Sequence, residues 1–395
     1  MNIKSVEAFS VDLSPKVQRK AYQSEGRQPA SPMARYPKFQ GKRSSWMASW
    51  PPIGCVVTAD DGTFGFGVGG YSGPVCPIIN EHFAEHLVGE NCFATERHFD
   101  VMMRISSPYG STGLASNAIS AVDLALWDLK GKLLGRPVYE LLGGPQKEKI
   151  FCYATGFDID WYQELGFKAF KLPMTHGPID GIAGLNEAEK LVAETREKVG
   201  DSAELMLDCW LALDVEYTVR LATRLRPYRL RWIEDYLLPE EMNGFAEVRK
   251  RVPWQGLATG EHWYLPPTFS VAAENRLVDV FQPDTLWCGG LTSQLRIARI
   301  AEANGIQVIP HGGMNWPYAQ HLIYATSGTT WGERSDGVAE PGVPLEDMVR
   351  LPGTAVIKDG HLVPSDGPGF GIEIDRVWID ERRRRIPVST TNQGM

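Results

Sequence analysis

Five short apolar runs in the second half of the chain each close with a polar side chain, and this pattern restricts the folds open to the sequence. The closing residues are Asp208, Glu234, Glu261, Asp284 and His311. Successive closing residues lie 26, 27, 23 and 27 positions apart. That spacing fits one strand, one helix and two loops, because a parallel crossover takes at least about 10–12 residues. At equivalent strand ends the five side chains would meet on one face of a (β/α)8 barrel, also called a modified TIM barrel.

The chain is longer than one barrel requires. Its 395 residues exceed the roughly 250–300 that a single hydrophobic core usually holds, so we expect a second, smaller domain. We predict an N-terminal α+β capping domain at 1–145 with a lid loop at 14–50, and a catalytic barrel at 146–352. A C-terminal segment, 353–395, is expected to return to the capping domain.

Local patterns predict the elements of these parts. A strand is expected at 2–12, a hairpin at 53–59 and 64–68 around an Asp-Gly turn, and helices at 77–104 and 114–135, the second apolar enough to be buried between domains. The run Glu381-Arg382-Arg383-Arg384-Arg385 is expected to be a solvated tail. Barrel strands are predicted at 150–155, 168–172 and around 331–333, and barrel helices near 186–199, 214–226, 241–251, 267–275, 292–304 and 318–326.

Composition excludes several classes of protein. The residues are 43% hydrophobic and 22% charged, which is ordinary for a globular protein. The net charge of −8 disfavours nucleic acid or an anionic membrane surface as a partner. Six cysteines without a Cys-x-x-Cys pair indicate reduced thiols, and the N-terminus has the character of neither a signal nor a transit peptide, so we expect a cytoplasmic protein.

Three successive strand ends carry carboxylates: Asp208, Glu234 and Glu261. Oxygen ligands that leave room for water and substrate suit Mg²⁺. Helix capping, or pairing with arginine at the barrel rim, is the alternative for any one of them. Three in register favour a Mg²⁺ site.

The next two strand ends bring an imidazole beside a carboxylate, His311 and Asp284. A carboxylate on one ring nitrogen fixes the tautomer and raises the basicity of the other, which is the arrangement of a general base. A buried core histidine is the alternative. Glu333, after the last predicted strand, would lie beside His311 and hydrogen-bond the reacting carboxylate. Metal and base together indicate removal of a proton next to a substrate carboxylate.

These residues resemble the enolase superfamily, in its mandelate racemase-like branch. Residues 123–132 with 141–144 look like the helix that joins that superfamily's capping domain to its barrel, and the ligand set and His–Asp pair match motif by motif. Four further segments look most like the L-rhamnonate dehydratases: 171–178, 205–210, 260–262 and 282–292.

The resemblance implies Mg²⁺-dependent dehydration of a sugar acid, L-rhamnonate or a close 6-deoxy or aldonic acid, to a 2-keto-3-deoxy acid by syn elimination. It also implies substrate contacts from Arg43, Lys171, His262 and Trp210, and a homo-oligomeric assembly. Many relatives have a Lys-x-Lys pair whose last lysine is a second base, whereas here Lys171 is followed by Leu172 and Pro173. Bacterial rhamnonate dehydratases also have a lid histidine, and this chain has no histidine before His82.

Two other functions stay open at this point. A racemase, epimerase or cycloisomerase would share the fold, but a racemase needs bases on both faces of its substrate. A metal-binding protein without catalysis would keep the ligands. The expected partner in the dehydratase interpretation is a small sugar acid.

Overall fold

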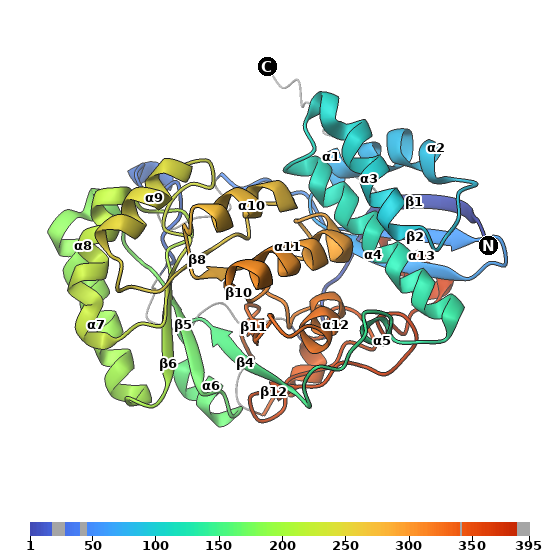
Figure 1. Ribbon diagram of the computed structural model, residues 1–395. Coiled ribbons are helices and arrows are strands. Elements are labelled where there is room, and N and C mark those ends of the chain that lie inside the picture. Colours follow the sequence, from blue (N-terminus) through green and yellow to red (C-terminus); the bar gives the residue numbers. More distant parts are fainter. Residues whose placement is uncertain (18–27, 40–45, 340–341, 385–395) are drawn as a thin grey trace, which may run out of the picture.

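The computed structural model describes residues 1–17, 28–39, 46–339 and 342–384. Figure 1 shows two parts: an antiparallel sheet covered by helices on the right, and a barrel of parallel strands with helices around it on the left. The (β/α)8-type barrel with an α+β capping domain is therefore confirmed.

The capping sheet is antiparallel, in the order β13-β1-β2-β3. Its strands are β1 (Ile3–Val11), β2 (Ile53–Ala59), β3 (Phe64–Gly69) and β13 (Arg383–Arg384). The predicted hairpin is present, because β2 and β3 pair from Ile53 with Gly69 to Thr58 with Phe64. Gly62 in its turn has a φ of 89°, a conformation that glycine adopts without steric strain.

Helix α4 (Leu114–Leu134) is buried along most of its length, as its apolar sequence predicted. It packs directly on β3. A Cβ at Gly65 or Gly67 would stand 2.0 Å from the carbonyl oxygen of Ala125 or Ala121. Glycine at these two positions therefore allows the close contact between helix and sheet.

The helix predicted over 77–104 is interrupted. The segment consists of α1 (Ser72–Pro77), the π-helix η3 (Ile78–Phe83), α2 (Ala84–Leu87) and α3 (Thr95–Ser106). At the break, Gly89 has a φ of 87°. Its N–H donates to the carbonyl of Ile3, and the N–H of Ile3 donates to the carbonyl of Glu90. The residues between α2 and α3 thus hydrogen-bond the start of β1. Helical periodicity in the sequence does not reveal this long-range interaction.

Eight parallel strands form the barrel, in the order β10-β9-β8-β7-β6-β5-β4-β11. A parallel bridge from Val308 to Thr329, just before β11, closes the ring. The strands are β4 (Ile150–Thr155), β5 (Ala169–Pro173), β6 (Glu204–Asp208), β7 (Ile233–Glu234), β8 (Leu257–Thr259), β9 (Val280–Phe281), β10 (Gln307–Val308) and β11 (Trp331–Arg334). The short β12 (His361–Leu362) pairs antiparallel with β4.

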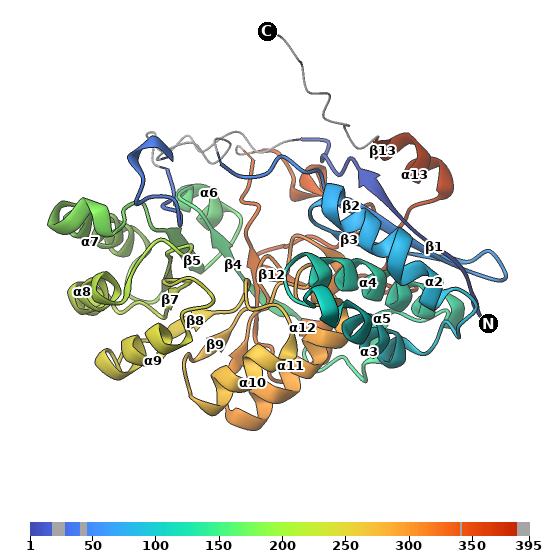
Figure 2. The ribbon, with the colours of Figure 1, turned by 90° about the horizontal axis from the view of Figure 1, so that it is seen from above.

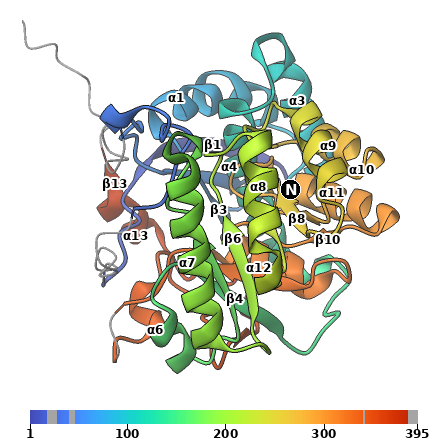
Figure 3. The same cartoon turned by 90° about the vertical axis from the view of Figure 1, so that its left-hand side faces the viewer.

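Helices surround the strands, and Figure 3 shows α7 and α8 in front of β4 and β6. The predicted barrel helices are all found, although α7 begins five residues earlier than expected. They are α7 (Gly181–Val199), α8 (Val215–Leu225), α9 (Met242–Arg251), α10 (Pro266–Glu274), α11 (Gly290–Asn304) and α12 (Pro317–Ala325). Shorter helices are α5 (Val138–Leu141), α6 (Ile159–Glu164), α13 (Arg376–Arg382) and the 3₁₀ turns at Pro37–Phe39, Ser107–Tyr109, Pro178–Asp180, Arg226–Tyr228 and Leu345–Met348.

The barrel interior contains one buried apolar cluster to which seven strands or strand ends contribute. Its largest members, Tyr153 and Trp232, meet at 5.7 Å between ring centroids. The others are Ala169, Met206, Ala258, Val280 and Ile309. A filled interior leaves the carboxyl ends of the strands as the place for chemistry.

The basic run near the C-terminus was predicted to be a solvated tail, but its residues up to Arg384 are bound to the capping sheet. Arg383 and Arg384 pair with β1, and their guanidinium groups form ion pairs with Glu7 and Asp12. The prediction was wrong there because the opposite charges lie more than 370 positions away in the sequence. Domain boundaries at 145/146 and 352/353 stay predictions.

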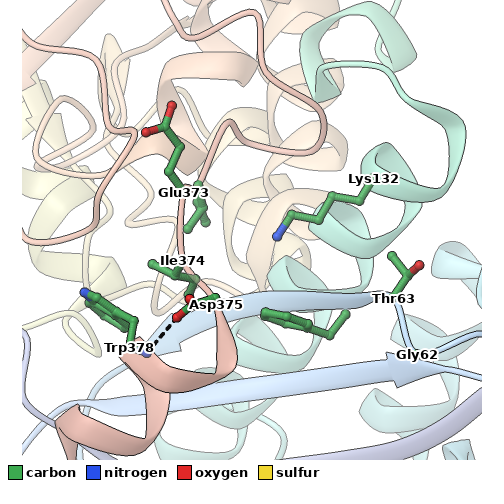
Figure 4. A pocket seen from close by; sticks show the side chains of 9 residues that line it. Gly62, Thr63, Lys132, Glu373, Ile374, Asp375 and Trp378 are labelled. Atoms are coloured by element: carbon green, nitrogen blue, oxygen red, sulfur yellow. Dashed lines mark hydrogen bonds between the residues drawn. The ribbon is translucent and has the colours of Figure 1, made fainter.

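The returning segment also lines a pocket of about 790 Å³ with the hairpin turn and α4 (Figure 4). Phe64, Lys132 and Trp378 are among its lining residues. None of the predicted site residues contributes to it, so this pocket is separate from the strand ends.

Two further observations concern the whole chain. All six cysteines are buried and unpaired, as expected of reduced thiols. Within the described residues, no helix combines the length and apolar composition needed to cross a bilayer.

A buried carboxylate joins α4 to the barrel. Asp123, fully buried, accepts hydrogen bonds from the backbone N–H of Thr292 at 2.9 Å and from its hydroxyl at 2.6 Å. The same hydroxyl accepts from the indole N–H of Trp127 at 2.8 Å. Thr292 lies in the first turn of α11, so Asp123 accepts these bonds at a helix N-terminus, where the helix dipole favours negative charge. Burial opposes this effect and raises the pKa of Asp123 to about 7.

We expect Asp123→Ala to lower the free energy of unfolding by roughly 2–4 kcal/mol, since two buried donors lose their acceptor. Asp123→Asn, which keeps one acceptor, should lose less. Thermal unfolding of both variants measures the effect, and an unchanged melting temperature for Asp123→Ala would contradict it.

A buried histidine connects α12, α5 and the C-terminal segment. Nδ1 of His321 accepts a hydrogen bond from the backbone N–H of Tyr139 at 3.1 Å, and its ring packs on Phe370 at 5.4 Å. Burial lowers the pKa of His321 to about 3. The neutral imidazole is therefore the folded form.

This depressed pKa predicts a pH dependence of stability. The unfolded chain takes up a proton near pH 6.5 and the folded chain does not. Stability is therefore lost as pH falls below about 6.5, by up to about 1.4 kcal/mol per pH unit. Melting temperatures from pH 8 to pH 5 should fall more steeply for the wild type than for His321→Gln, whereas parallel curves would contradict the assignment.

Candidate active site

A buried lysine lies at the centre of the strand ends. Lys171, on β5, is completely buried and forms ion pairs with Glu234, with Glu333 at 2.7 Å and with Asp208 at 3.4 Å. Burial alone would lower the pKa of Lys171, but Glu234, Glu333 and Asp208 outweigh it and raise that pKa well above its ordinary value. Lys171 is therefore a fixed cation that neutralises part of a carboxylate cluster.

Asp208 and Glu234 are neighbours in strand register, since Asp208 on β6 pairs with Glu234 on β7. Glu234 also accepts hydrogen bonds from the indole N–H of Trp232 at 2.8 Å and the amide of Gln282 at 2.7 Å. Burial raises the pKa of Glu234 well above its usual range, and Asp208 adds to the shift. The cluster thus carries more negative charge than Lys171 balances.

Glu333, on β11, faces the same centre. It accepts hydrogen bonds from the hydroxyl of Thr155 and, at 2.8 Å, from the backbone N–H of Gly312. Burial would raise its pKa, but Lys171 and His311 lower the pKa of Glu333 to about 2. It is an ionised carboxylate beside His311.

His311 and Asp284 lie three residues beyond the ends of β10 and β9, and they meet. Nδ1 of His311 lies 2.8 Å from Oδ2 of Asp284, whose other oxygen accepts from the backbone N–H of Leu286 at 2.7 Å. Nε2 of His311 lies 3.1 Å from Glu261. Despite burial, Glu261, Asp284 and Glu333 raise the pKa of His311 well above its ordinary value. In this arrangement the surrounding carboxylates favour the protonated form of the imidazole.

Glu261, two residues beyond the end of β8, lies between two imidazoles. Its second oxygen is 3.3 Å from Nδ1 of His262, and this nitrogen is also 3.4 Å from Asp235. Burial raises the pKa of Glu261 to about 7. Burial would lower the pKa of His262, but Glu261 and Asp235 raise it to about 9.

The lid segment reaches the barrel at Trp210. The rings of Trp46 and Trp210 lie 5.9 Å apart between centroids. The backbone N–H of Trp210 donates to Asp208 at 3.0 Å. Earlier in the predicted lid segment, the N–H of Ala30 donates to the carbonyl of Met174, and Figure 2 shows this blue segment beside α6 and α7. Arg43, the predicted substrate-binding residue of the lid, lies outside the described residues.

The predicted metal ligands are not drawn together as a compact group. Asp208 and Glu234 form ion pairs with Lys171, whereas Glu261 contacts the imidazoles of His262 and His311. Over the described ranges, one group of three has all its ligand atoms within 4.8 Å of one another: Asp235, Glu261 and His262. His262 supplies a nitrogen, which suits Mg²⁺ less well than oxygen.

Sequence reasoning missed four residues that shape the site: Thr155, Asp235, Gln282 and Trp287. For Asp235 a signal existed, because it precedes His262 by 27 positions, the same separation as Asp284 and His311. Trp287, whose ring lies 5.3 Å from His311 and 5.4 Å from His262, lies with Gln282 in the segment 282–292. The sequence indicated a resemblance for this segment but no role for either side chain.

Family models match both parts of the chain. Residues 53–143 match the model described as "Mandelate racemase / muconate lactonizing enzyme, N-terminal domain", and residues 159–378 match "Enolase C-terminal domain-like".

Individual relatives agree with this assignment. The L-rhamnonate dehydratase of Saccharopolyspora erythraea is 38% identical over 352 residues, covering 88% of this chain and 89% of that protein. A protein of Caldivirga maquilingensis, provisionally given the same name, is 39% identical over 363 residues, 88% of this chain and 87% of its own.

Among solved structures, rhamnonate dehydratase from Gibberella zeae complexed with Mg has a TM-score of 0.88 at 30% identity, over 97% of this chain and 96% of that one. With both domain models matched and relatives of this similarity, the chain belongs to the enolase superfamily of enzymes, in the group of mandelate racemase and muconate lactonizing enzyme.

Proposed function

We propose that the chain is a Mg²⁺-dependent sugar-acid dehydratase that converts L-rhamnonate, or a close 6-deoxy or aldonic acid, to the 2-keto-3-deoxy acid. The observation that carries the proposal is the His311–Asp284 pair, 2.8 Å apart, set among the carboxylates around Lys171. The names of the relatives support the substrate class, and the Mg complex of one relative supports the metal.

The donor set fits a divalent cation. Burial raises the pKa of both Glu234 and Glu261, so a second positive charge beside Lys171 would relieve the excess of carboxylates. The buried amide oxygen of Gln282 also has no hydrogen-bond partner among the described residues, so it is an unused oxygen acceptor beside Glu234. We propose Asp208, Glu234 and Glu261 as the ligands, because all three offer oxygen.

In this mechanism His311 removes the proton at carbon 2 of the sugar acid. Asp284 holds Nδ1, so Nε2 is the nitrogen that accepts the proton. In the structure Nε2 faces Glu261 at 3.1 Å, and this carboxylate favours the protonated ring. If Glu261 served as a metal ligand, this interaction would be weakened and the neutral imidazole of His311 could act as the base. When bound, Mg²⁺ would supply positive charge beside the substrate carboxylate as negative charge accumulates there.

The protonated His311 then returns a proton to the hydroxyl leaving carbon 3. Because one imidazole works on one face of the substrate, the elimination is syn. Glu333, held by Thr155 and Gly312, lies beside His311. In this scheme it donates a hydrogen bond to the reacting carboxylate in its protonated form, which the negative charge of the bound substrate would favour.

The environment of Lys171 favours dehydration over racemisation or epimerisation. A racemase or epimerase needs a second base on the opposite face, but Lys171 is buried, paired with three carboxylates and held in its charged form. Its three carboxylate partners stabilise the protonated form, which cannot accept a proton from the substrate. We therefore assign Lys171 an electrostatic role in place of the substrate contact expected from the sequence.

The remaining contacts complete the proposal. Trp210 and Arg43 would line the lid side of the substrate, with Arg43 pairing with its carboxylate or hydroxyls. Lids of this kind exclude water from the reaction. A homo-oligomeric state and a cytoplasmic location stay predictions.

The purified protein with L-rhamnonate and Mg²⁺ should form a 2-keto-3-deoxy acid, and EDTA should abolish turnover until Mg²⁺ is restored. Semicarbazide detection of the α-keto product across a set of sugar acids measures this. Chelator-resistant turnover would refute the metal, and the absence of a keto product from every sugar acid would refute the function.

His311→Asn should lower kcat by about 10³-fold, because general acid–base catalysis typically contributes 10²–10⁴-fold. Asp284→Asn should lose less, since the imidazole remains. The matched control is His86→Asn, the same change at an exposed histidine of the capping domain. Near-wild-type turnover by His311→Asn would show that another group is the base.

A further inference from the structure

The site contains a second imidazole–carboxylate pair that the scheme above does not use. In each pair, Nδ1 of a histidine faces an aspartate that precedes it by 27 positions: His311 with Asp284, and His262 with Asp235. Glu261 lies between the pairs, 3.1 Å from one imidazole and 3.3 Å from the other. The two imidazoles are also similarly exposed, at 20% and 22% of their side-chain surface.

Asp235 is held in a strained and buried position. Its φ is 46°, a left-handed conformation that is uncommon outside glycine, and it is only 1% exposed. The backbone secures this geometry, because the N–H of Asp235 donates to Ala258 and its carbonyl accepts from Leu211. Its Oδ1 accepts from the hydroxyl of Thr259, and its Oδ2 faces His262. Strand β8 and the backbone therefore aim one carboxylate oxygen at the imidazole.

Trp287 forms a common wall for both imidazoles, with ring centroids 5.4 Å from His262 and 5.3 Å from His311. Its own carbonyl is fixed by the hydroxyl of Ser116 on α4 at 2.7 Å. With Nδ1 of His262 directed at Asp235 and Glu261, Nε2 is the nitrogen left for another partner. Across the described segments, no hydrogen bond involves that atom.

We propose that Asp235 is a positioning residue: together with Thr259 it orients His262 so that Nε2 hydrogen-bonds a substrate hydroxyl beside the carbon at which His311 acts. The proposal rests on the sugar-acid dehydratase function. Asp235 acts only through His262, which distinguishes this role from that of a metal ligand in the group Asp235, Glu261 and His262.

A double-mutant cycle tests this dependence. Asp235→Asn should lower kcat by about 10- to 100-fold, the usual range for a residue that orients a functional ligand, and should change KM by less than about threefold. In a His262→Asn background the same change should have no further effect on kcat. An additional tenfold loss in that background would overturn the proposal.

The Mg²⁺ concentration for half-maximal activity separates positioning from metal binding. It should be the same for the wild type and Asp235→Asn. A tenfold increase would mean that Asp235 supports the metal, and the proposal would fail. Thr259→Val, which removes one hydroxyl but keeps the carboxylate, should lose less kcat than Asp235→Asn.

Crystal structures of the wild type and Asp235→Asn give a readout that needs no turnover. The ring of His262 should leave its position between Asp235 and Trp287 in the variant. An unmoved ring would overturn the proposal. If the wild type dehydrates no sugar acid, the proposed function fails while the ring position still decides the role of Asp235.

Discussion

The buried ammonium group of Lys171 is the interaction on which the rest of the site depends. A completely buried lysine is stable only when opposite charges surround it, and three carboxylates from β6, β7 and β11 provide them. Those carboxylates in turn could not be buried together without a cation. Lys171 therefore draws acids from distant parts of the sequence to one point at the barrel mouth.

The balance of charge around Lys171 also affects which group of the site can accept a proton. The charge of Lys171 is balanced by its three carboxylate partners, and in the proposed scheme the base is His311. Glu261 contacts both His311 and His262, which makes it the residue through which metal binding and imidazole availability would be coupled. In this arrangement, a cation that recruits Glu261 would also free the base.

Packing outside the barrel fixes the positions of these groups. Helix α4 lies against β3 because glycine is present where the helix comes closest, and its Asp123 and Ser116 hold α11 and Trp287 from the capping side. The wall behind the two imidazoles is therefore built partly by the capping domain. This explains why a helix without any predicted site residue is buried along most of its length.

The sequence by itself determined the barrel, most of its helices and the residues at its strand ends, because hydrophobic periodicity and strand-end position are local properties. It also indicated the His311–Asp284 pair through their adjacent strands. Only the tertiary structure decided that Lys171 is buried among three carboxylates, that Asp235 faces His262, and that Arg383 and Arg384 complete the capping sheet. Each of these interactions joins charged residues that are far apart in the sequence. Local sequence patterns do not indicate which charged residues will be neighbours in the fold.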